Sequence, residues 1–160
     1  MRIVIIGILW LAFMLFGCPD WLQYGPWELR ALVYPLFHAN IFHLACNCLG
    51  IWATFDPRVS DPWRRLLVGY AISVLVYPLS VHPVVGISNV LFAISGMCSP
   101  VRSPRWKSPT MLVFVAVMLL MALLPGVSAV THVASFILGV LYSSIRIKLQ
   151  RHDTGRTAGR

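Results

Sequence analysis

The sequence predicts an all-α membrane protein whose helices form a six-helix bundle. Of its 160 residues, 58% are apolar and 11% are charged, and the mean hydropathy is +0.77. A soluble domain carries about 25% charged residues, so this chain has too few to cover a surface that faces water. The composition therefore excludes a soluble globular enzyme, a disordered segment and a nucleic-acid-binding module.

Six apolar segments supply the expected helices, because a backbone inside a membrane must satisfy its own hydrogen bonds. The segments cover residues 3–18, 34–55, 66–81, 84–98, 111–124 and 129–147. Several are shorter than the ~20 residues that cross a ~30 Å hydrocarbon core. We expect neighbouring helices or a locally thin bilayer to accommodate the short ones.

The two ends of the chain differ in character. Residues 1–18 also allow a second interpretation, a cleaved signal, but the bulky Phe16 near the cleavage point favours a retained first helix. We assign residues 1–150 to the membrane domain. Residues 151–160 are expected to form a basic, disordered cytoplasmic tail attracted to anionic membrane lipid rather than to nucleic acid.

The basic residues predict the orientation of the helices. With the N-terminus in the cytoplasm, 12 of the 13 Lys and Arg residues fall on the cytoplasmic side, and only Arg30 falls outside. Such a one-sided distribution follows the positive-inside rule. We therefore expect a multi-pass protein of the bacterial cytoplasmic (inner) membrane with both termini in the cytoplasm.

A few polar side chains interrupt the apolar segments. An ionisable residue at the centre of a span costs ~2.5–3.5 kcal/mol and by default indicates function. A lone serine more often bonds back to its own helix, and a lone histidine or asparagine often holds helices together. The polar residues within the second, fourth and sixth segments are His38, His43, Asn47, Ser88, Asn89 and His132.

Three of these side chains are expected to lie at one depth. Ser88 and His132 each precede the first cytoplasmic charge of their segment by 14 residues, and His43 precedes Arg58 by 15. At ~1.5 Å per helical residue, each lies ~21 Å or slightly more from the cytoplasmic boundary. Asn47 lies one turn below His43 on the same helix face. A common depth in three helices indicates a site.

These residues occur in motifs that resemble the rhomboid family of intramembrane serine proteases. Residues 38–47 read HANIFHLACN, similar to the family's His, His, Asn pattern. Residues 86–89 read GISN, similar to its GxSG segment, and residues 132–139 read HVASFILG, similar to its HxxGxxxG segment. Residues 27–30, WELR, look like a loosened form of the family's Trp-Arg loop. The motifs follow the family's order.

The resemblance implies an endopeptidase that cleaves transmembrane segments of other membrane proteins, without a cofactor. Ser88 would be the nucleophile and His132 the general base. The six segments hold no Asp or Glu near this depth, so a Ser–His dyad is expected rather than a triad. His43, Asn47 and the backbone N–H of Ser88 would form the oxyanion hole.

Further residues of the motifs would support this site. Phe92 would pack on the His132 ring, as the family's aromatic residue does, and His38 belongs to the His, His, Asn pattern. Gly86 would let the chain turn into its helix. Ser135 and Gly139 form a stripe of small residues that would bring the sixth helix close to the fourth.

The main departure from the family pattern is Asn89, which stands where the family has glycine after the serine. Its side chain is expected to crowd the nucleophile, to compete for His132 and to slow the enzyme. The alternative function is a catalytically weak or inactive pseudoprotease that binds transmembrane helices without cutting them.

A metal-binding function is a third interpretation, because His38, His43, Cys46 and Cys48 lie close together in sequence. On one helix His43 and Cys46 face together, whereas His38 and Cys48 point elsewhere. Soft-metal sites need better convergence, so we expect no metal site.

Overall fold

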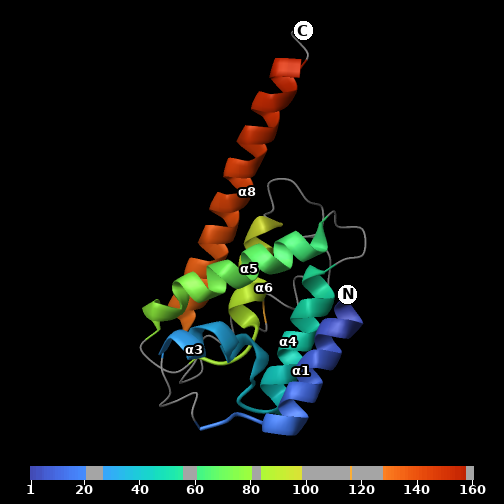
Figure 1. Ribbon diagram of the computed structural model, residues 1–160, viewed down its shortest axis with the longest axis vertical. Coiled ribbons are helices and arrows are strands. Elements are labelled where there is room, and N and C mark those ends of the chain that lie inside the picture. Colours follow the sequence, from blue (N-terminus) through green and yellow to red (C-terminus); the bar gives the residue numbers. More distant parts are fainter. Residues whose placement is uncertain (21–26, 56–60, 81–83, 99–115, 117–127, 158–160) are drawn as a thin grey trace.

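The computed structural model is helical throughout the regular elements that it describes (Figure 1). It describes residues 1–20, 27–55, 61–80, 84–98, 116 and 128–157, and side chains within these ranges except those of residues 27 and 151–157. No strand occurs in this part of the chain. The predicted all-α class is therefore confirmed there.

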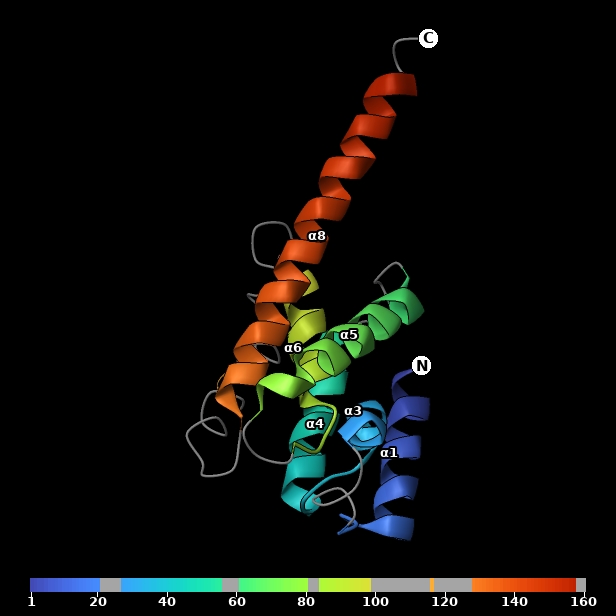
Figure 2. The same cartoon turned by 60° about the vertical axis from the view of Figure 1, so that its left-hand side comes forward.

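The elements follow in this order, with η denoting a 3₁₀ helix: α1 (Arg2–Phe16), α3 (Trp27–Val33), η1 (Tyr34–Leu36), α4 (Ile41–Thr54), α5 (Pro62–Val76), η2 (Tyr77–Leu79), α6 (Ser88–Met97) and α8 (Ala129–Thr157). The helices α4, α6 and α8 run in the same direction, and α1 runs in the opposite direction (Figures 1 and 2). The three parallel helices carry the polar residues singled out in the sequence, except His38, which precedes α4.

The expected six-span bundle is not confirmed within the described residues. One helical stretch, Ala129–Gln150, is long and apolar enough to cross a membrane. Glu28–Leu36 and Ile41–Thr54 reach that length only as a pair, and the pair is bent by 77°. Helices α1 and α6 are apolar but shorter. The expected segment 111–124 lies outside the described residues, apart from residue 116.

The second expected segment, residues 34–55, is broken rather than continuous. Tyr34–Leu36 forms the short helix η1, and Phe37 then adopts an extended conformation. Asn40 starts α4, because its side-chain oxygen accepts a hydrogen bond of 2.9 Å from the His43 backbone N–H. Such a cap satisfies one of the donors that the first helical turn leaves without a partner.

Two other boundaries also differ from the expected ones. Helix α5 begins at Pro62, a residue favoured at the first helical position, and the chain tightens into η2 at its end, where Pro78 lies. Helix α8 continues to Thr157, so residues 151–157 are helical rather than a disordered tail. Extending an existing helix costs far less free energy than nucleating one.

Helix α6 is the centre of the molecule. Nine of its ten residues are buried, and it packs against α4, α5 and α8. At ~1.5 Å per residue it is only ~15 Å long, about half of a bilayer core. The neighbouring helices surround this short helix. This is one of the two ways in which we expected a short apolar segment to be accommodated.

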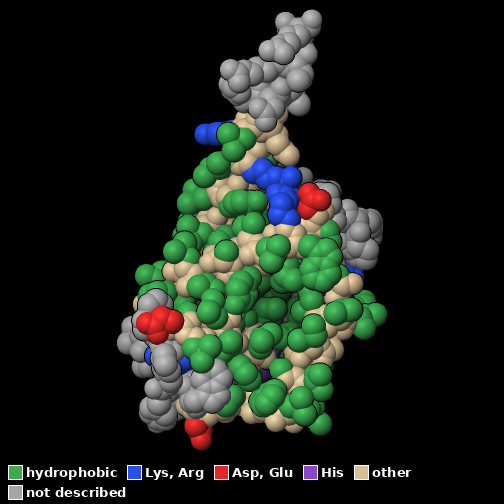
Figure 3. Space-filling view, viewed as in Figure 1, with side chains coloured by type: hydrophobic (Ala, Val, Ile, Leu, Met, Phe, Trp, Pro, Cys, Tyr) green, Lys and Arg blue, Asp and Glu red, His purple; other side chains and the backbone are tan. Residues whose placement is uncertain are grey.

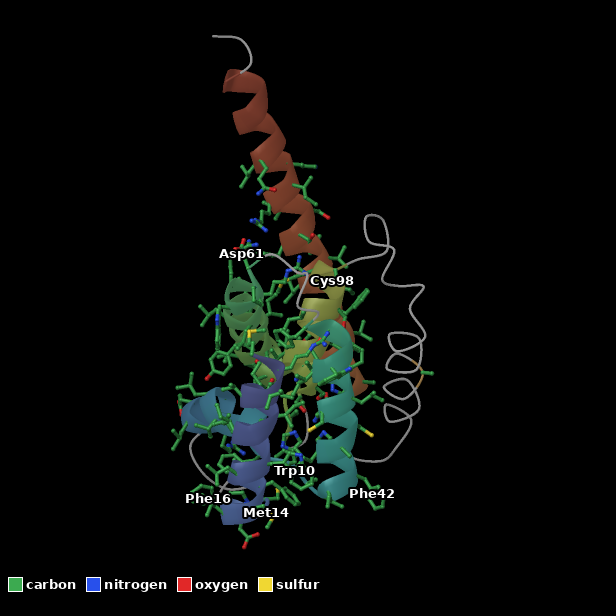
Figure 4. The ribbon with its side chains drawn as sticks, turned by 90° about the vertical axis from the view of Figure 1, so that its right-hand side faces the viewer. Trp10, Met14, Phe16, Phe42, Asp61 and Cys98 are labelled. Carbon is green, nitrogen blue, oxygen red and sulfur yellow. The ribbon has the colours of Figure 1, made fainter. Side chains whose placement is uncertain are left out.

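The face drawn in Figure 3 is largely hydrophobic; a group of basic side chains with one acidic neighbour lies in its upper part, and other charged side chains lie near its lower edge. Asp61 lies 3.3 Å from Arg64 and 3.7 Å from Arg146, which ties α5 to α8. Figure 4 shows Asp61 at the end opposite Phe16 and Phe42. The side chain of Phe42 is 79% exposed, as expected for a residue that contacts lipid.

Candidate active site

The N-terminal ends of α6 and α8 bring Ser88 and His132 together. Ser88 is the first residue of α6, and His132 lies in the first turn of α8. Their side chains are hydrogen bonded, with 2.8 Å between the Ser88 Oγ and the His132 Nε2. Both residues are buried, with 3% and 7% of their surface exposed. A hydroxyl and an imidazole thus lie in contact, away from bulk water, which is the geometry that a nucleophile and its base require.

Close packing of α6 on α8 makes this contact possible. A Cβ atom added at Gly96 would collide with the Phe136 carbonyl oxygen, and one added at Gly139 would collide with the Ala93 carbonyl oxygen. Only glycine lets the two backbones approach so closely at these points. Ser135, the other member of the expected stripe, is fully buried.

An aromatic neighbour contacts the His132 ring, and within the part of the chain that the structure describes no carboxylate does. Phe92, one turn along α6 from Ser88, stacks on the ring with 4.7 Å between centroids and 21° between planes. The His132 Nδ1 is buried and has no hydrogen-bond partner in the described part of the chain. Among the described residues, Ser88 and His132 thus form a pair, and none of those residues orients the histidine as the third group of a triad does.

His43 and Asn47 of α4 face the turn that precedes Ser88. Gly86 has a φ of +96°, a conformation that favours glycine. A Cβ atom there would lie 2.6 Å from the His43 Cε1 and 2.9 Å from the Asn47 Nδ2. The amide of Asn47 is buried, and neither its nitrogen nor its oxygen has a partner among the described residues. These two side chains therefore border the turn that leads to Ser88.

His38 lies behind His43. Its side chain is completely buried, and the two imidazole rings meet edge to face with 5.2 Å between centroids. This contact restricts the His43 ring. In the residues that the structure describes, no three His, Cys, Asp or Glu side chains are placed to share a metal ion.

A comparison with protein families assigns the chain to a family. A family model, the rhomboid domain, matches residues 26–149. The chain belongs to the rhomboid family. The match contains all the polar residues described above, and a rhomboid domain implies an integral membrane protein. No curated protein and no solved structure matches the chain in the same comparisons.

The environment of Asn89 in this rhomboid differs from the expected one. Its side chain is completely buried, and its Nδ2 donates a hydrogen bond of 3.1 Å to the Tyr34 hydroxyl. The amide is therefore engaged with η1, and no bond to His132 forms. The expected competition with the base is absent, because the side chain is turned towards a different partner.

Tyr34 and Asn40 are the residues near the site that the sequence patterns did not single out. One signal was present: the tetrapeptide VYPL occurs at residues 33–36 and again at residues 76–79. Each copy forms a 3₁₀ helix, and the two tyrosines, Tyr34 and Tyr77, pack with 5.0 Å between ring centroids. For Asn40, the signal was its position three residues before His43, which is typical of a helix cap.

Proposed function

We propose that this rhomboid is an active intramembrane serine endopeptidase that uses Ser88 and His132 as a catalytic dyad. The observation that carries the proposal is the buried hydrogen bond of 2.8 Å between the Ser88 Oγ and the His132 Nε2. Ser88 begins α6, so its hydroxyl has no carbonyl of an earlier helical turn to bond, and the partner that the structure gives it is the imidazole on another helix. A pair of this kind is the activated nucleophile of acyl-transfer enzymes.

In the proposed reaction, the Ser88 Oγ attacks the carbonyl carbon of the scissile peptide bond. The Nε2 of His132 takes the serine proton and then gives it to the leaving amine. Water next attacks the acyl-enzyme ester, with His132 again as the base, and releases Ser88. Since no described residue bonds to the His132 Nδ1, we infer that the orientation of the imidazole depends on its stacking against Phe92.

The tetrahedral intermediate carries a negative charge on the former carbonyl oxygen. The side chains of His43 and Asn47 and the backbone N–H of Ser88 are the proposed donors to this oxygen. Backbone N–H groups in the first turn of a helix have no partner within it, and Ser88 begins α6. The Asn47 amide is buried without a partner in the described residues, so its donors remain available. Donors of this type are worth ~3–4 kcal/mol each in other hydrolases.

We infer that the substrate is a transmembrane segment of another membrane protein and that the protein acts in a bacterial cytoplasmic membrane. The exposed apolar surface of the helices suits a lipid environment. The termini are proposed to be cytoplasmic, on the side where Asp61, Arg64 and Arg146 gather.

The alternative function is a pseudoprotease that binds transmembrane helices without cutting them. It rests on one observation, the asparagine that stands at position 89 in place of the family's glycine. The hydrogen bond from Asn89 to Tyr34 favours the active enzyme, since it turns the amide away from His132.

Cleavage of a reporter with one transmembrane segment, in detergent and in vesicles, tests the proposal. Wild type should cut the reporter and react covalently with a fluorophosphonate probe, whereas Ser88→Ala and His132→Ala should do neither. Ser95→Ala is the matched control, because Ser95 is also buried on α6 but its hydroxyl has no partner in the described residues. It should retain activity. A folded wild-type protein that neither cuts nor reacts would establish the pseudoprotease instead.

A further inference from the structure

Tyr34 contacts the proposed nucleophile turn on both sides of Ser88. Its carbonyl oxygen accepts a hydrogen bond of 2.9 Å from the Gly86 N–H, two residues before the serine. Its hydroxyl accepts a hydrogen bond of 3.1 Å from the Asn89 side chain, one residue after the serine. One residue of η1 is thus bonded to both ends of a four-residue turn.

The Tyr34 hydroxyl is itself fixed. It donates a hydrogen bond of 3.2 Å to the Ser73 carbonyl oxygen of α5, and the tyrosine is completely buried. Beyond Ser73, the Tyr70 hydroxyl donates to the Leu32 carbonyl oxygen in α3. Hydrogen bonds therefore connect the start of α6 to α5 and to the segment that contains α3 and η1.

The bond between Asn89 and Tyr34 has a specific consequence for the turn. The Oδ1 of Asn89 is buried and has no hydrogen-bond partner among the described residues, so the contact with Tyr34 is the one that the structure records for this amide. A buried amide that loses its partner either pays the cost of desolvation or moves to find another partner. Either response displaces the residue next to Ser88.

We propose that Tyr34 is a positioning residue that acts through Asn89 to hold the Ser88 hydroxyl and backbone N–H in their reactive geometry. The proposal rests on the protease function proposed above. It gives Asn89 a role of its own in this chain: a tethered asparagine, together with Tyr34, sets the position of the turn. Tyr34 does not touch the reacting atoms, so it acts on the rate of the chemical step and not on substrate binding.

A double-mutant cycle tests this proposal. The variants are Tyr34→Phe, Asn89→Ala and the double variant, assayed for kcat and KM on the transmembrane reporter and for the rate of fluorophosphonate labelling. Each single change is expected to lower kcat and the labelling rate by about tenfold, with KM altered by less than about twofold. The double variant should lose about tenfold and not a hundredfold, because both changes break one interaction.

Tyr77→Phe is the matched control. Tyr77 packs against Tyr34 in the same buried cluster and begins the second 3₁₀ helix, η2, but no hydrogen bond joins it to α6. Its loss should leave kcat within about twofold of wild type, since only contacts outside the turn change. Thermal unfolding of all variants in the same detergent identifies any that fail to fold, and for these the labelling rate of the folded fraction is compared.

Additive losses in the double variant, unchanged kcat in Tyr34→Phe, or an equal loss in Tyr77→Phe would each overturn the role of Tyr34 while leaving the protease function intact. A wild-type protein without cleavage or labelling would overturn the protease function itself. The two failures are therefore distinguishable.

Discussion

A glycine-to-alanine change at residue 139 should destabilise this rhomboid, although helix propensity predicts the opposite. In a helix interior, alanine is more favourable than glycine by ~0.5–1 kcal/mol. Gly7 in α1 provides the matched control, since a Cβ atom there would meet nothing within 4 Å. Gly7→Ala should therefore show the propensity gain alone.

The magnitude at Gly139 follows from the backbone atoms that a methyl group would meet. The Cβ atom would collide with the Ala93 carbonyl oxygen and lie 3.1 Å from the Met97 nitrogen. Neither atom can rotate away, so α6 and α8 must separate. Inserting a methyl group into a packed interface costs ~1–3 kcal/mol, and after the propensity gain of ~0.5–1 kcal/mol we expect a net loss of ~1 kcal/mol.

The same separation should affect the dyad. His132 precedes Gly139 by seven residues, which is ~10 Å along α8. A shift of α8 away from α6 lengthens the 2.8 Å contact between Ser88 and His132. The rate of fluorophosphonate labelling should therefore fall in Gly139→Ala and stay unchanged in Gly7→Ala.

Unfolding in mixed detergent micelles, followed by far-ultraviolet circular dichroism, measures the difference in stability between the two variants. The free energy of unfolding should change in opposite directions, with Gly7→Ala at least as stable as wild type and Gly139→Ala less stable. If both variants gained stability equally, the close approach of α6 and α8 at Gly139 would be refuted.

Three further predictions concern the turn before Ser88, the residue after it and the orientation of the chain. Gly86→Ala should abolish reporter cleavage and lower stability by ~1–3 kcal/mol, because a positive φ is strained in alanine; wild-type behaviour would contradict the described turn. Asn89→Gly should lower kcat by about tenfold (~1.4 kcal/mol), since it removes the tether to Tyr34, whereas a rise would restore the steric interpretation drawn from the sequence. A cysteine at Pro104 should resist impermeant thiol reagents added outside intact cells, and strong labelling there would reverse the proposed orientation.

The sequence by itself determined the class of the protein and the set of residues to which we assign its proposed function. Composition was sufficient for the membrane class, because the charged fraction is a property of the whole chain. The depth argument placed Ser88 and His132 in one layer, and the structure has them in contact. That inference worked because helical rise is constant, so distances along each helix are encoded locally.

The tertiary structure decided where the second segment breaks and where Asn89 points. The break at residues 37–40 depends on how η1 packs beneath α5 and α6 as well as on local propensity. The direction of Asn89 depends on the Tyr34 hydroxyl, 55 residues earlier in the chain. A side chain's rotamer is selected by the partner that satisfies it in the folded state, and sequence spacing gives the depth of a residue along its helix but not the direction in which its side chain points.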